Sequence, residues 1–116
     1  MRKILIFIFS ILFSCGIYKS NKNDCDENEK FKVKFFYHIN YIKNNISISQ
    51  DAKFRESIIF ISNYAPVSTD RIMNYARTYP RGVFEEDRKK WMVWYEENKC
   101  KNIQFKTSYV IPEVYK

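Results

Sequence analysis

A chain of 116 residues has room for one domain with a modest core, and this length excludes two independent domains. A hydrophobic content of 46% and an aromatic content of 18% exclude an intrinsically disordered chain, and two glycines in the whole sequence argue against a turn-rich all-β fold. The formal net charge of +7 is compatible with an anionic partner such as nucleic acid or a phospholipid surface.

The chain opens with a charged pair followed by an apolar run. Arg2 and Lys3 precede the stretch from Ile4 to Phe13, which is apolar apart from one serine. This order is typical of a secretory signal, in which the basic residues stay on the cytoplasmic side while the apolar segment enters the export machinery. A membrane-spanning helix needs about 20 apolar residues, so this run is too short for a stable anchor. The pattern predicts a signal peptide over residues 1–14.

The end of the apolar run, Leu12-Phe13-Ser14-Cys15, resembles the lipobox of bacterial lipoproteins. The resemblance implies that the sulfur of Cys15 carries a diacylglycerol, that the chain is cut before Cys15, and that a fatty acid such as palmitate is added. Acyl chains contribute about 0.8 kcal/mol per buried methylene, so two or three hold a small domain on a membrane. By the same resemblance, Gly16 implies the outer membrane, because an aspartate there would favour inner-membrane retention. The alternatives are an ordinary cleaved signal with an incidental Cys15, or a short uncleaved anchor.

The segment after the leader is polar. Residues 16–29 contain almost nothing to bury, so residues 15–29 are predicted to be a tether and residues 30–116 a small helical domain. If Cys25 forms a disulfide, the free part is expected to shrink to residues 16–24. An exported protein meets little nucleic acid, and the richness in Lys, Asn, Ile, Phe and Tyr is the bias of an AT-rich genome. We therefore expect no nucleic-acid partner, and a membrane contact made through the N-terminal lipid.

Three cysteines leave one unpaired in a disulfide framework. If Cys15 carries lipid, Cys25 and Cys100 remain as one pair, and an oxidising envelope compartment permits a disulfide between them. Two independent buried thiols are the alternative.

Residues 30–43 fit two patterns. Alternation of Phe31, Val33 and Phe35 with lysines is typical of a half-buried strand. The same stretch places five side chains on one helical face: Phe31, Phe35, His38, Ile39 and Ile42. The length of the second pattern favours a helix.

Two helices are expected in the middle of the chain. Asp51 can cap the first, which Pro66 ends. Its apolar stripe consists of Phe54, Ile58, Ile61 and Ala65. Ser68 or Thr69 can cap a second, short helix that Pro80 ends. Its expected buried face consists of Ile72, Tyr75, Ala76 and Tyr79.

A turn at Arg81-Gly82 is expected to lead into a third helix over residues 83–100. Its acidic start, Glu85-Glu86-Asp87, is interpreted as a solvated first turn. The string Trp91-x-x-Trp94-Tyr95-x-x-Asn98-Lys99 resembles the tail of HEAT-like helical modules in small exported bacterial proteins. That resemblance covers roughly residues 50–100, and it implies a helical scaffold without a particular activity.

After Cys100 the chain alternates polar and apolar residues, and Pro112 prevents a central strand position, so an extended segment along the helices is expected. The predicted fold is mainly α, a small single domain of three to four short helices with an extended C-terminal segment.

Candidate catalytic groups are few. His38 is the sole histidine, and the sequence contains no Gly-rich phosphate loop and no metal-binding spacing of histidines. We therefore predict no enzyme activity, no cofactor and no metal. Trp91, Trp94 and Tyr95 are the candidate binding residues, because exposed aromatic rings stack on sugars and anchor protein interfaces, although core positions are the alternative.

The leading hypothesis is a non-enzymatic, lipid-anchored cell-envelope protein that binds another envelope or secreted protein as an inhibitor, immunity factor or assembly accessory. Glycan binding through Trp91, Trp94 and Tyr95 is the alternative. A small hydrolase is a third hypothesis, which would need a cleft that joins His38 to two carboxylates.

Overall fold

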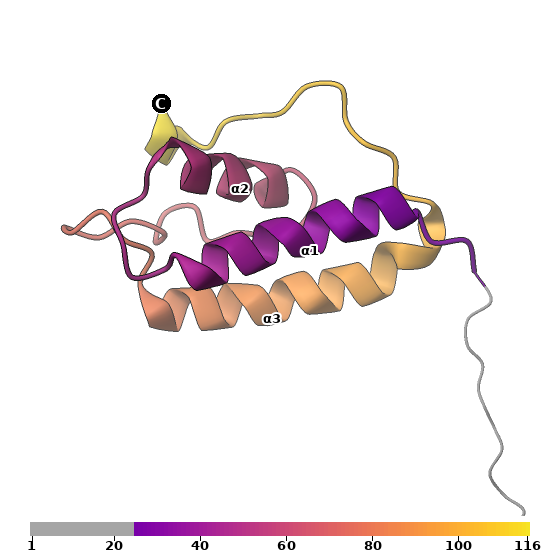
Figure 1. Cartoon of the computed structure of the whole chain (residues 1–116), viewed down its shortest axis with the longest axis horizontal. Helices are drawn as coiled ribbons and strands as arrows, with labels where there is room; N and C mark the ends of the chain where they lie inside the picture. Colours follow the sequence, from indigo (N-terminus) through magenta and orange to yellow (C-terminus); the bar gives the residue numbers. More distant parts are fainter. Residues whose placement is uncertain (1–24) are drawn as a thin grey trace, which may run out of the picture.

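The computed structural model describes residues 25–116, and within that range the chain is helical, with no strand. The three helices are α1 (Glu29–Asn44), α2 (Ala52–Ser62) and α3 (Arg81–Asn98), and two short 3-10 turns follow, η1 (Lys99–Lys101) and η2 (Glu113–Tyr115). Figure 1 shows α1 between α2 and α3, with the C-terminal segment passing along the side of α2. The predicted mainly helical domain is confirmed. The predicted signal peptide, Cys15 and most of the tether lie outside the described residues.

Helix α1 resolves the ambiguity of residues 30–43. The side chain of Asn28 caps the helix by accepting a hydrogen bond from the backbone N–H of Phe31, at 3.1 Å. The five side chains of the helical pattern are all buried: Phe31, Phe35, His38, Ile39 and Ile42. Val33 is 69% exposed, whereas a strand would have placed it on the same face as Phe31 and Phe35. The helical pattern therefore determines the structure of this stretch.

Helix α2 begins where the sequence predicts and ends at Ser62, earlier than the end predicted at Pro66. The Oδ1 atom of Asp51 accepts a hydrogen bond from the backbone N–H of Phe54 at 2.9 Å, which satisfies one of the free donors at the helix start. The whole predicted stripe is buried: Phe54, Ile58, Ile61 and Ala65. Rings from α2 and α1 pack together, with the centroids of Phe31 and Phe60 6.0 Å apart.

The prediction of a second short helix between Ser68 and Pro80 is wrong, because this stretch consists of turns and bends. A hydrogen bond of the Asn74 side chain accounts for the loop that forms in place of the helix. This side chain accepts a hydrogen bond from the backbone N–H of Thr78 at 2.9 Å and closes a tight loop, in which Arg77 has a positive φ of 62°. Tyr75 is fully exposed at the tip of the loop, while Ile72 and Tyr79 are buried on either side of it. Two of the four expected core positions are therefore correct, in a different backbone conformation.

Helix α3 begins two residues earlier than expected. Pro80 is the N-cap residue, with φ −61° and ψ 131°, so Arg81 and Gly82 form the first turn of the helix and not the predicted turn before it. A proline at this place costs the helix no hydrogen bond, because the first backbone N–H groups of a helix have no partner within it. Phe84, Trp91 and Tyr95 form the buried face.

The C-terminal segment, defined as residues 102–116, is extended up to Pro112 and is fixed by side chains of the helices and of their caps. Asn28 donates a hydrogen bond from Nδ2 to the carbonyl of Ile103 at 2.7 Å. Asn63 makes two bonds to Val110, donating to its carbonyl at 3.0 Å and accepting from its N–H at 2.9 Å. The hydroxyl of Tyr115 donates to Oε1 of Gln50. The predicted extended segment is confirmed, and side-chain amides take the place of a neighbouring strand.

Replacing Asn63 with alanine is expected to release the middle of the C-terminal segment. Two exposed hydrogen bonds are lost, which reduces local stability by about 1 kcal/mol. The backbone N–H of Val110 should exchange its hydrogen with solvent about five times faster, as measured by NMR. Asn40→Ala, at an exposed position of α1, is the matched control and should leave that rate unchanged. Equal rates in both variants would show that these bonds do not hold the segment.

Candidate functional site

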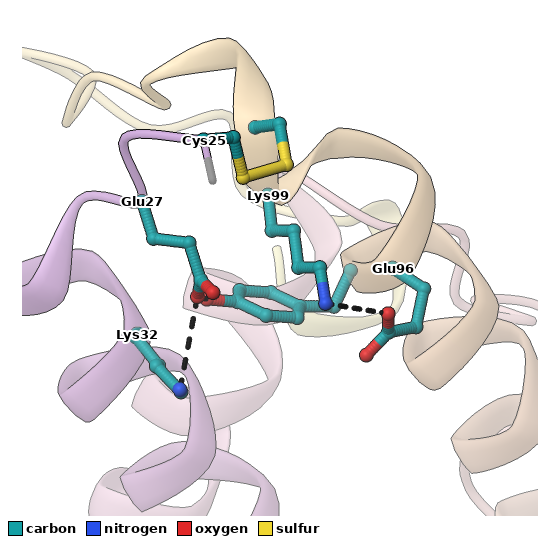
Figure 2. The surroundings of a disulfide bond; sticks show 7 residues. Cys25, Glu27, Lys32, Glu96 and Lys99 are labelled. Atoms are coloured by element: carbon teal, nitrogen blue, oxygen red, sulfur yellow. Dashed lines mark hydrogen bonds and ion pairs between the residues drawn. A yellow bond between two sulfur atoms is a disulfide. The ribbon is translucent and has the colours of Figure 1, made fainter. Parts of the chain in front are cut away.

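The predicted pairing of Cys25 with Cys100 is confirmed. Their sulfur atoms are 2.02 Å apart and their Cα atoms 5.2 Å apart. Cys25 lies just before α1 and Cys100 lies in η1, just after α3, so the bond joins the start of one helix to the end of the other. Figure 1 shows these two helix ends on the same side of the domain, and Figure 2 shows the bond. It connects positions 75 residues apart in sequence and closes residues 25–100, which include all three helices, into one loop.

Residues next to the disulfide attach the start of the described chain to the domain. The hydroxyl of Tyr95 donates a hydrogen bond to Oε1 of Glu27 at 2.6 Å, and this bond, with the nearby Lys32 and Lys99, lowers the pKa of Glu27. Figure 2 shows Glu27 facing Lys32, and the pair of Lys99 and Glu96, whose charged atoms are 2.8 Å apart. Residues 25–28 therefore belong to the domain, as expected for the case in which Cys25 forms a disulfide.

The three aromatic candidates do not form one exposed face. Trp91 is completely buried, and its indole N–H donates to the carbonyl of Pro66 at 2.7 Å. Tyr95 is buried against α1, with its ring centroid 5.6 Å from that of Phe35. Trp94 is half-buried and borders a groove along α3. Two of the three predicted binding residues are thus core residues, and the structure does not bring the trio together at the surface.

Asp87 corrects the interpretation of the acidic triplet as a solvated first turn. Glu85 and Glu86 are exposed, but Asp87 is completely buried and accepts three hydrogen bonds. Its Oδ1 accepts from the hydroxyl of Ser68 at 2.7 Å, and its Oδ2 accepts from the N–H of Ser68 at 3.2 Å and from the hydroxyl of Tyr79 at 2.5 Å. No ion pair among residues 25–116 involves Asp87. These bonds attach Ser68 and Tyr79, near the two ends of the irregular stretch between α2 and α3, to helix α3.

The sequence did contain a signal for the burial of Asp87. It lies three residues after Phe84 and four before Trp91, so it occupies the apolar face of the helix. Burial and the bond to Asp87 raise the pKa of the Tyr79 hydroxyl, so Tyr79 remains a hydrogen-bond donor in neutral and alkaline solution.

His38 lies at the wall of a pocket of about 340 Å³ between α1, α2 and the C-terminal segment. Its Nδ1 is 2.8 Å from the hydroxyl oxygen of Ser57, and its ring centroid is 4.5 Å from that of Phe60. Burial, together with the nearby charge of Lys34, lowers the pKa of His38 to about 4, so the ring is neutral at pH 7. Glu56 is the single carboxylate among the described residues that line this pocket, whereas the hydrolase hypothesis required two.

The buried His38 is expected to make the protein less stable in acid. Its ordinary pKa is 6.5, so between about pH 4 and 6.5 the unfolded chain binds more protons than the folded one. The contribution is fully present above pH 6.5 and is lost as the pH falls, by up to about 3 kcal/mol. Urea unfolding across this range measures the slope. His38→Gln should flatten it, and an equal slope in both proteins would show that His38 does not titrate in this way.

Two kinds of feature are not found within residues 25–116. No helix in this range is long and apolar enough to cross a membrane. No group of three or more metal-ligating side chains gathers in the same part of the chain.

Comparisons with known proteins give no family for this chain: no family model matches it, and neither a curated protein nor a solved structure does.

Proposed function

We propose that this chain is an exported, lipid-anchored protein of the cell envelope whose folded part is a non-enzymatic binding module for another envelope or secreted protein. The signal peptide predicted over residues 1–14 directs export, and the lipid predicted on Cys15 anchors the protein to the membrane. The disulfide supports a location outside the cytosol, because such bonds persist in oxidising compartments and are rare in the cytosol.

The observation that carries the binding function is the apolar surface of the C-terminal segment. Five large apolar side chains of this segment are exposed: Phe105, Tyr109, Val110, Ile111 and Val114. Val110 is the most exposed of them, at 74%. Single exposed apolar residues are ordinary on protein surfaces, but a cluster on one short segment is typical of an interaction site.

The same segment is rigid enough to serve as a binding surface. Asn63 holds the backbone of Val110 by both its N–H and its carbonyl, so the side chain of Val110 points away from a fixed backbone. Tyr109 is held by its hydroxyl, 3.3 Å from that of Tyr64. A surface that is ordered before binding loses less entropy on association, which favours affinity. An inhibitor, an immunity factor or an assembly accessory needs such a surface and no catalytic groups.

Photo-crosslinking in the organism of origin tests this function. A photoreactive amino acid replaces Val110 in the full chain, and the matched control carries it at Val93, which is 55% exposed on α3. Figure 1 shows α3 on the side of α1 away from the C-terminal segment. We expect one discrete envelope protein to be cross-linked from position 110 and not from position 93. Identical products from both positions, or none from position 110, would contradict the proposal.

The cross-linked protein then allows a quantitative measurement. Val110→Asp should weaken its binding to the purified full chain by about tenfold or more, because a charge enters the apolar contact. Val93→Asp should leave the affinity unchanged. The opposite pattern would place the interface on α3 beside Trp94.

A further inference from the structure

The pocket beside His38 is suited to a small ligand, and Tyr109 and Ile111 belong both to its lining and to the surface proposed for a protein partner. Its volume of about 340 Å³ lies within the range of small-molecule sites in proteins. Helix α1 forms one wall, α2 forms another, and the C-terminal segment forms the third. Most of the wall is apolar or aromatic, and its side chains include Ile59, Phe60 and Ile111.

One ring nitrogen of His38, a residue of the pocket wall, lacks a hydrogen bond. His38 is 5% exposed, and its Nδ1 is occupied by Ser57. Its other ring nitrogen, Nε2, has no hydrogen-bond partner among residues 25–116. A buried polar atom without a partner destabilises the protein, and a ligand that bonds to it recovers the lost free energy.

The state of the ring determines what Nε2 can bind. Ser57 can donate its hydroxyl proton to Nδ1, and the neutral ring then carries its own proton on Nε2. In that tautomer Nε2 is a donor, so its natural partner is a carbonyl or carboxylate oxygen.

The charges at the pocket favour an anion. Lys34 and Arg55 contribute one cation each from α1 and α2, and aromatic faces hold both in place. The Nζ atom of Lys34 is 5.4 Å from the ring centroid of Phe60, and the guanidinium of Arg55 is 5.9 Å from that of Tyr115. Against these two cations stands the exposed carboxylate of Glu56, so the pocket carries a net positive charge.

We propose that this pocket binds a small organic acid, a carboxylate attached to an apolar or aromatic body. The carboxylate lies toward Lys34 and Arg55 and accepts the proton of Nε2 of His38. The apolar body packs against Phe60 and Ile111. Charge-assisted hydrogen bonds of this kind are about twice as strong as neutral ones, so the acid group supplies much of the affinity.

Because His38 is the sole histidine, one NMR experiment reports on the pocket directly. The full-length protein is labelled with ¹⁵N-histidine, prepared in detergent without a histidine tag, and titrated with 2-naphthoate. We expect a saturable shift of the Nε2 resonance of the neutral ring. The amine of matched size, 2-naphthylmethylammonium, should give no saturable shift. Saturation by the amine at the same concentration, or the lack of saturation by the acid, would overturn the proposal.

Charge variants separate the pocket from general attraction to a basic protein. Lys34→Gln and Arg55→Gln should each weaken 2-naphthoate binding by about fivefold to tenfold. Lys53→Gln is the matched control, because Lys53 also lies over an aromatic ring, that of Tyr41 at 5.4 Å, but does not line the pocket. Equal weakening in all three variants would show that 2-naphthoate is held by non-specific attraction to a basic protein, which would contradict the proposal. Unchanged binding in all three would also contradict the proposed orientation of the acid.

Discussion

Replacing Cys25 and Cys100 with serine is expected to lower the free energy of unfolding by about 4 to 5 kcal/mol on the chain-entropy model. The bond closes a loop across 75 positions, and opening it restores a large number of conformations to the unfolded chain. A domain of this size has a total stability of about 5 to 10 kcal/mol, so the loss removes much of it. Tryptophan fluorescence during urea unfolding of the full chain measures the change, because Trp91 is buried in the core.

The reductant dithiothreitol provides the control for this prediction. It should lower the urea midpoint of the wild-type protein to that of the double serine variant, and it should leave the variant unchanged. Cys100 is exposed and Cys25 is half-buried, so reductant can reach the bond in the folded protein. A wild-type midpoint that does not respond to dithiothreitol would show that the two cysteines are not bonded or that the bond does not stabilise the fold.

Asp87→Ala is expected to destabilise the protein by about 3 to 5 kcal/mol. The substitution leaves the hydroxyl of Tyr79 without its acceptor in the core, and it also removes the acceptor of the hydroxyl and N–H of Ser68. Each buried donor that loses its partner costs about 1 to 3 kcal/mol. Asp87→Asn should recover little of the loss, because an amide group offers one acceptor oxygen in place of two.

The neighbouring Glu85 offers a matched control, since it lies two residues away on the exposed side of α3. Glu85→Ala should change the free energy of unfolding by less than about 0.5 kcal/mol. Asp87→Ala should also increase hydrogen exchange in the irregular stretch between α2 and α3, which loses its attachment at Ser68 and Tyr79. Similar stabilities for Asp87→Ala and Glu85→Ala would contradict the structural role given to Asp87.

Local signals in the sequence were sufficient to predict α2, and for α1 they favoured a helix over a strand. Each helix has an apolar stripe with helical spacing and a side-chain cap; the cap of α2, Asp51, was expected, whereas that of α1, Asn28, was not. The extended C-terminal segment was predictable too, because Pro112 excludes a regular strand position and no helical spacing precedes it. In these places the local preference of the chain and the packing of the domain favour the same conformation.

The irregular stretch between α2 and α3 could not be predicted in this way. Its residues have helical spacing, but Asn74 bonds to Thr78 and closes a loop that no helix can contain. Ser68, expected as a helix cap, donates to Asp87 19 residues away. The pocket beside His38 also depends on contacts distant in sequence, because the C-terminal segment forms one of its walls. Spacing within one element carries no information about such contacts.

The mass of the intact protein, isolated from the organism of origin, tests the central claim most directly. The proposal predicts that the protein is recovered with the membrane fraction, and that its chain begins at Cys15 and carries two or three acyl chains. It also predicts a mass lower by two hydrogens than that of the reduced form, because Cys25 and Cys100 are joined. A full-length chain beginning at Met1, without lipid and with free thiols, recovered from the soluble cell interior, would contradict it.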